Sequence, residues 1–156
     1  MRRRQNQRGL TLVELIVAFT ILALLSTMAV PLTRYRVQRD KERELRIAVR
    51  EIRRSIDAYK DAADAQKFQI KVGTEGYPES LEQLVEGVIM SGSADGTRIK
   101  FLRRIPIDPM TGKAEWGMRS MQDDPKSQSW GGENVFDIYS KSMERSRNGT
   151  PYSEWQ

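Results

Sequence analysis

Cysteine and histidine are both absent from this chain of 156 residues. Without cysteine the chain has no disulfide and no thiolate zinc site, and without histidine it lacks the commonest general base. Cys–His and Ser–His nucleophile pairs are excluded for the same reason. These absences leave the redox compartment open, but they weigh against an enzyme.

Positive charge is not spread evenly along the chain. The chain carries 26 basic and 21 acidic residues, a net charge of +5. Four of the basic residues lie within residues 1–9, which contain no acid, so the rest of the chain has 22 basic against 21 acidic residues. The excess belongs to a short basic head, and we expect no nucleic-acid partner.

A long apolar run follows the basic head. It extends from Leu10 to Leu32, with Glu14 as its only charged residue. About 20 apolar residues cross a bilayer, and preceding arginines keep the N-terminus in the cytoplasm. A charge deep in a spanning helix costs about 2.5–3.5 kcal/mol, so Glu14 needs a partner.

Three interpretations of this run compete. It is a secretory signal cleaved near residues 27–29, a plain single-span anchor, or a segment processed at its start. In the third interpretation a protease cuts between Gly9 and Leu10. The new ammonium group on Leu10 then neutralises Glu14, within one chain or between neighbouring chains.

The stretch "RGLTLVELIVAFTILALL" resembles the processing and methylation segment of type IV pilin-like proteins. The resemblance implies that prepilin peptidase cleaves after Gly9, that Leu10 is N-methylated, and that Glu14 acts in filament assembly. It also implies a helix kink at Pro31. One departure is Leu10 itself, where the family usually has phenylalanine.

A second pattern follows the apolar run. Apolar residues recur at 4-3-4-3-4 spacing, which places them on one stripe of a helix, with charged residues on the other faces. The stripe consists of Leu45, Val49, Ile52, Ile56, Tyr59 and Ala63. We expect one long helix from Leu10 to Lys67, kinked at Pro31, which requires a membrane or a bundle of identical helices.

The remaining residues predict a small head. A capping box formed by Ser80 and Gln83 predicts a short helix at residues 80–86. A loop is expected at residues 91–96, a turn around Pro109 and Gly112, and strands at 114–119 and 134–141. The fold class is therefore α+β, a long N-terminal helix packed against a small C-terminal antiparallel β-sheet.

These patterns divide the chain into four segments. We expect a cleaved leader at residues 1–9, an apolar transmembrane or filament-core segment at 10–32, an amphipathic stem at 33–67 and a globular head at 68–156. Tyr152 and Trp155 are expected to hold the C-terminal tail against the head.

The head also resembles that of the type II secretion system major (G-type) pseudopilin. The pieces "YPESLEQLVEG", "FLRRIPIDPMTGK" and "DIYS" occur in the family's order. The resemblance implies calcium in the loop before the last strand, with Asp124 and Asp137 as ligands and Asp123 and Glu133 nearby. Calcium takes six to eight oxygens, so a solvated acidic loop is the alternative.

The function that the resemblance implies is structural. The resemblance implies a single-pass protein of the bacterial inner membrane, with a cytoplasmic N-terminus and a periplasmic head. It also implies a homopolymeric periplasmic filament that drives protein export. Its expected partners are membrane lipid, prepilin peptidase, minor pseudopilins and an inner-membrane assembly platform with a secretion ATPase.

Two alternatives remain open. One is a type IV or competence pilin of a surface fibre, although such major pilins often carry a C-terminal disulfide loop. The other is a membrane-anchored periplasmic enzyme that uses a carboxylate pair such as Asp124 and Glu133 for acid–base chemistry.

Overall fold

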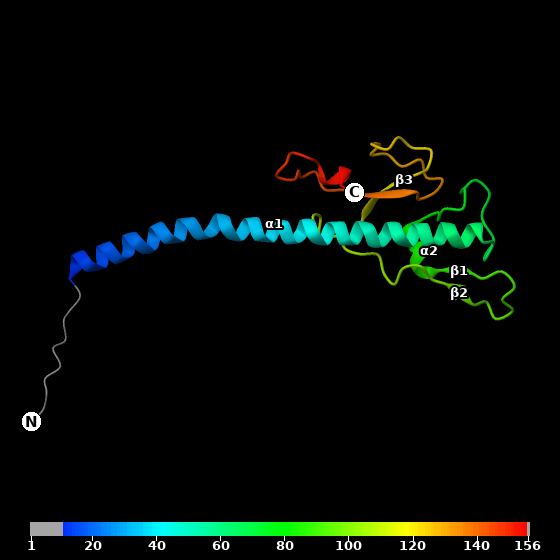
Figure 1. Cartoon of the computed structure of the whole chain (residues 1–156), viewed down its shortest axis with the longest axis horizontal. Helices are drawn as coiled ribbons and strands as arrows, with labels where there is room; N and C mark the ends of the chain where they lie inside the picture. The colour runs from blue at the N-terminus through cyan, green and yellow to red at the C-terminus, as the bar shows by residue number, and fades with distance from the viewer. Residues whose placement is uncertain (1–10, 156) are drawn as a thin grey trace, which may run out of the picture. The chain divides into compact units, whose positions relative to one another are not determined.

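The computed structural model describes residues 11–155, apart from the side chains of residues 27–34. A long helix is followed by a short helix, two small antiparallel sheets and a 3-10 turn (Figure 1). The predicted α+β class is confirmed. The elements are α1 (Leu12–Asp64), α2 (Leu81–Glu86), β1 (Val88–Ile89), β2 (Arg98–Ile99), β3 (Trp116–Arg119), β4 (Asp137–Ser140) and η1 (Tyr152–Glu154).

Helix α1 contains 53 residues and its helical backbone continues through Pro31. The kink at Pro31 stays a prediction. The expected end at Lys67 is wrong, because α1 ends at Asp64. Gln66 adopts a φ of 54°, its N–H bonds to the carbonyl of Ala63, and the Lys67 N–H bonds to that of Ala62. This is a Schellman cap built on a glutamine instead of the usual glycine.

The chain divides into two compact units, residues 1–40 and residues 41–156, and the division falls within α1. Leu45 is the first buried apolar residue of α1 in the described part of the chain. The second unit therefore consists of the C-terminal part of α1 and everything that packs on it.

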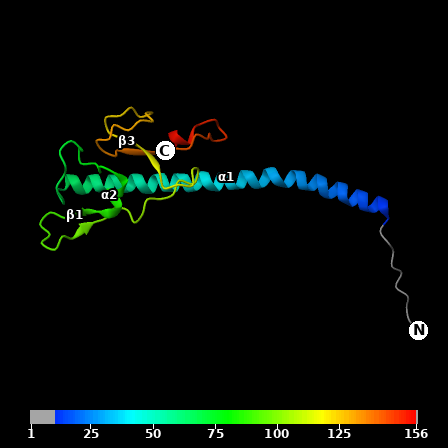
Figure 2. The ribbon, with the colours of Figure 1, turned by 180° about the vertical axis from the view of Figure 1, so that it is seen from behind.

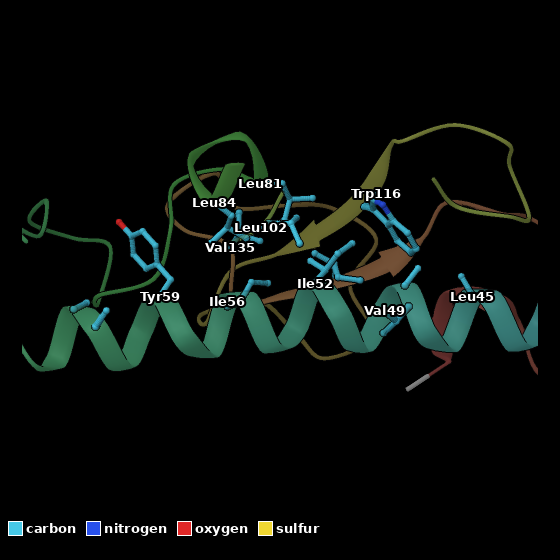
Figure 3. Close-up of a cluster of buried hydrophobic side chains, with 14 of the residues drawn as sticks. Leu45, Val49, Ile52, Ile56, Tyr59, Leu81, Leu84, Leu102, Trp116 and Val135 are labelled. Atoms are coloured by element: carbon cyan, nitrogen blue, oxygen red, sulfur yellow. The ribbon is translucent and has the colours of Figure 1, made fainter. Parts of the chain in front are cut away.

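The core of the second unit forms on the predicted stripe of α1. All six stripe residues are at most 4% exposed. Figure 3 shows stripe residues pointing towards side chains from α2, β3 and the loops. The residues that cover the stripe include Leu81, Leu84, Leu102, Trp116, Val135 and Ile138. Burial of each large apolar side chain contributes about 1.5–3 kcal/mol, so this contact explains why the head requires the stem.

Two hairpins accompany α1. Strand β3 pairs with β4 in register Trp116↔Ser140 through Arg119↔Asp137. The predicted strands at 114–119 and 134–141 are confirmed in place but are shorter. The sequence did not reveal the β1–β2 hairpin, in which Val88 pairs with Ile99. In both Figure 1 and Figure 2 the β1–β2 and β3–β4 ribbons lie on different sides of α1.

The start of α2 differs from the predicted capping box. The Ser80 side chain makes no capping hydrogen bond. Instead, the Gln83 side-chain oxygen accepts a hydrogen bond from the Glu79 N–H at 2.8 Å, one residue before the expected position. The predicted turn after Asp108 is confirmed, because Asp108 bridges to Lys113 and Gly112 has a φ of 73°.

Candidate functional site

Glu14 lies in the first turn of α1. The hydroxyl oxygen of Thr11 accepts a hydrogen bond from the Glu14 N–H at 3.4 Å. Thr11 and Glu14 therefore have the T-x-x-E spacing of a capping box. A carboxylate in this first turn also stabilises the helix through its interaction with the helix dipole. The T-x-x-E spacing at residues 11–14 is the sequence signal for this cap. Gly9 and Leu10 lie outside the described residues, so cleavage, methylation and the pairing of Glu14 stay predictions.

The first turns of α1 expose apolar side chains on all faces. Leu12 and Phe19 are both 76% exposed, and every large apolar residue from 12 to 25 is more than half exposed. These residues are Leu12, Val13, Leu15, Ile16, Val17, Phe19, Ile21, Leu22, Leu24 and Leu25. Large exposed apolar patches mark contacts with other proteins or with lipid, so this surface needs an external partner.

Among the described residues, no helix contains an 18-residue stretch that is apolar enough to cross a membrane.

Asp137, predicted as a calcium ligand, is held by two arginines. Its Oδ1 lies 2.7 Å from Arg53 Nε and its Oδ2 lies 3.1 Å from Arg53 Nη2. Arg119 Nη1 approaches the same Oδ2 at 3.6 Å. Arg53 lies on α1 and Asp137 is the first residue of β4. The two hydrogen bonds between their side chains therefore join the stem to the last strand.

Arg119 is itself fixed by its surroundings. It is buried, its guanidinium stacks over the Tyr139 ring at 4.2 Å, and its Nε donates to the Ser127 carbonyl at 2.7 Å. The Tyr139 ring covers Gly117, where an added Cβ would lie 2.2 Å from the ring. Sequence reasoning missed this arrangement, because only the β3–β4 register brings these residues together.

The β3–β4 loop is closed by its own hydrogen bonds. Asp123 Oδ2 accepts from the Ser120 N–H at 2.7 Å and from the Gly131 N–H at 3.1 Å. These backbone bonds, that from Ser120 first, lower the pKa of Asp123. Buried Asn134 accepts from the Met121 N–H at 3.0 Å across the same loop. The loop therefore has internal order that does not depend on a metal ion.

The two predicted calcium ligands, Asp124 and Asp137, bind different partners within the protein. Asp124 Oδ1 accepts a hydrogen bond from the Lys126 N–H at 2.8 Å, while Asp137 binds arginine. No group of three or more metal-ligating side chains occurs in the described part of the chain. The carboxylates as arranged do not fit the oxygen shell of calcium. Calcium binding stays a prediction, and it requires Asp137 to leave Arg53.

A cavity of about 330 Å³ lies beside this cluster. Its lining includes Arg53, Arg119, Asp123 and Asp137. Asp124 and Glu133, the carboxylates considered for acid–base chemistry, are exposed and do not belong to the lining.

The C-terminal tail packs on the stem. Tyr152 is buried and donates a hydrogen bond to Glu42 Oε1 at 3.0 Å. Its ring contacts that of Trp155 with 5.0 Å between centroids, and the Arg46 guanidinium lies 4.4 Å from the Trp155 centroid. The prediction that Tyr152 and Trp155 hold the tail against the head is correct only in part: η1 contacts β4 of the head, but the two side chains also bind Glu42 and Arg46 of the stem.

Residues 4–30 match the family model described as the prokaryotic N-terminal methylation motif. No curated protein and no solved structure matches the chain. The matched range contains Gly9, Leu10 and Glu14. It implies processing by prepilin peptidase and assembly into a filament. Together with the α+β fold, the match supports a type IV pilin-like protein.

Proposed function

We propose that the chain is a structural subunit of a periplasmic pseudopilus that drives protein export through a type II secretion system. The methylation motif over residues 4–30 carries this proposal. The exposed apolar side chains of residues 12–25 support it, because identical helices packed side by side would cover them. The order of motifs in the head favours the pseudopilin over other pilin-like subunits.

In this proposal the chain performs no chemistry of its own. Prepilin peptidase removes residues 1–9 and methylates Leu10. The subunit waits in the inner membrane with its head in the periplasm, and an ATPase-driven platform lifts it into the filament beside minor pseudopilins. Glu14 meets the ammonium group on Leu10 of a neighbouring subunit and fixes its position.

Mass spectrometry of the protein from its native host tests the processing. We expect a chain that begins at Leu10 with an N-methyl group. A chain that begins at Val30, or one that retains Met1 and its arginines, would contradict the proposal.

Deletion of the gene tests the role. We expect loss of protein export to the medium, restored by the wild-type gene on a plasmid. A type IV or competence pilin is the second candidate, since the same motif is present there. Unchanged export with loss of surface fibres, twitching motility or DNA uptake would favour that candidate.

A further inference from the structure

Arg119 is a buried cation that uses only part of its hydrogen-bonding capacity. Its side chain is 8% exposed, and its Nε donates to the Ser127 carbonyl. Among the residues that the structure describes, neither Nη1 nor Nη2 of Arg119 donates a hydrogen bond. The ion pair between Nη1 and Asp137 Oδ2 spans 3.6 Å, which is longer than a hydrogen bond. The N–H groups on Nη1 and Nη2 therefore remain available to a ligand.

These N–H groups open onto the cavity of about 330 Å³ beside the β3–β4 loop, because Arg119 belongs to its lining. In the described part of the chain, every side-chain nitrogen or oxygen that is cut off from solvent has a hydrogen-bond partner. Nitrogens without such a partner must therefore keep some contact with solvent. For the buried guanidinium of Arg119, the cavity supplies this contact.

The other charged groups of the lining already have partners or face solvent. Asp137 is held by Arg53 through two hydrogen bonds, and Asp123 accepts hydrogen bonds from two backbone N–H groups. Lys126 and Glu154 also belong to the lining, are both exposed and carry opposite charges. The buried guanidinium is therefore the group of the lining that lacks acceptors.

The size and the remaining lining of the cavity suit a small ligand with an apolar part. Met121, Pro125, Phe136 and Trp155 supply apolar surface. Sites for small molecules have volumes of about 300–1,000 Å³, and this cavity lies at the lower end of that range. A guanidinium matches the planar carboxylate group, which it binds through two parallel hydrogen bonds.

We propose that this cavity binds a carboxylate, carried by a small organic acid or by the C-terminal residue of a peptide. Nη1 and Nη2 of Arg119 donate to the two carboxylate oxygens, and the apolar lining receives the carbon chain of the ligand. The site takes an anion, so it differs from the predicted calcium site. The inference does not depend on the proposed filament function.

Calorimetric titration of the full chain in detergent, with EDTA present, tests the proposal. The probe is N-acetyl-leucine, and its amide, which lacks the carboxylate, is the matched control. We expect the acid to bind with a Kd on the order of 1 mM and the amide to bind at least about tenfold more weakly. The ¹⁵N NMR signal of the Trp155 indole should shift on binding, whereas Trp116 and Trp130 do not line the cavity and their signals should stay in place.

Two variants connect the binding to the cavity. Met121→Trp adds bulk to the lining at a residue that is 55% exposed, so the chain should fold and bind the acid at least about tenfold more weakly. Met143→Trp is the matched control, because Met143 is 94% exposed and lies outside the lining, and its affinity should equal that of wild type. Arg119→Lys keeps the charge but loses the paired hydrogen bonds, and about tenfold weaker binding is expected.

Acetate distinguishes the two sources of the carboxylate. Acetate that binds as tightly as N-acetyl-leucine assigns the site to small organic acids. Acetate that binds about tenfold more weakly assigns it to a peptide C-terminus, whose side chain adds apolar contact. The proposal would be overturned by equal binding of N-acetyl-leucine and its amide, by wild-type affinity in Met121→Trp, or by no binding of either acid.

Discussion

Residues 12–25 and residues 45–63 belong to the same helix but meet different surroundings. The first segment exposes large apolar side chains on every face, whereas the second buries one stripe under the head and exposes charge elsewhere. Folding of a single chain therefore covers the apolar stripe of the second segment but leaves the apolar side chains of the first segment exposed. A monomer can complete the head by itself, while the N-terminal turns remain unsatisfied until lipid or other subunits surround them.

This comparison predicts that substitutions in the first segment affect assembly and that substitutions in the second affect folding. The largest effect is expected from Glu14→Gln. Glutamine preserves the T-x-x-Q form of the capping box but removes the charge that, in the proposed filament, pairs with the Leu10 ammonium. Loss of one partner of a buried ion pair costs about 3–5 kcal/mol, so electron microscopy should detect few or no filaments.

Two companions to Glu14→Gln separate charge from capping. Glu14→Asp keeps the charge with a shorter reach and should give intermediate filament numbers. Thr11→Ala removes the cap at a cost of about 1 kcal/mol and should leave most filaments in place. Wild-type filament numbers from Glu14→Gln would refute charge pairing, and peptidase recognition would then be the role to examine.

The next largest effect is expected from Ile52→Ala in the covered segment. Truncation of this fully buried side chain leaves a cavity and costs about 2–5 kcal/mol. The melting temperature of the full chain in detergent, followed by circular dichroism, should fall by about 10 °C. Ile47→Ala is the matched control, because Ile47 is 48% exposed on the same helix. Equal losses from both variants would contradict the burial pattern.

Metal binding tests the contact between stem and head. If calcium binds through Asp124 and Asp137, it competes with the Arg53 guanidinium for Asp137. We therefore expect millimolar calcium to raise the melting temperature, and EDTA to reverse this, more strongly in Arg53→Gln than in wild type. Asp137→Asn should abolish the response. A melting temperature that calcium leaves unchanged in wild type and in Arg53→Gln would refute the calcium prediction.

The smallest effect concerns acid stability of the β3–β4 loop. The pKa of Asp123 is lowered by hydrogen bonds from the Ser120 and Gly131 N–H groups. A lowered pKa contributes stability above the ordinary value of 3.8, and this stability is lost as pH falls through the folded-state pKa. Asp123→Asn should therefore melt lower than wild type at pH 6, with a smaller difference near pH 2. A difference that is constant with pH would contradict this account.

Periodicity made much of the fold predictable. The 4-3-4 stripe identified the buried face of α1, since one helical spacing determines which side chains share a face. Alternation and turn residues located β3, β4 and the turn after Asp108. The end of α1 was misplaced because a glutamine, Gln66, occupies the cap position where a glycine would have indicated the end of a helix. Strands β1 and β2 were missed because two residues are too few to show alternation.

The candidate site was less predictable than the fold. Asp137 was predicted as a calcium ligand, whereas its observed partner is Arg53, which lies 84 residues away in the chain. The same holds for the stacking of Arg119 on Tyr139, which depends on the β3–β4 register. Such partners are fixed by packing, and one sequence contains no local signal for them.

The contact between Tyr152 and Glu42 joins residues 110 positions apart, at opposite ends of the second unit. Because a chain is synthesised from its N-terminus, the face of α1 that carries Glu42 stays uncovered until residue 152 has emerged. A subunit truncated before residue 152 would expose this face of the stem and open locally to proteases. Closure of this face is therefore a late event in folding, because it needs residues from both ends of the second unit.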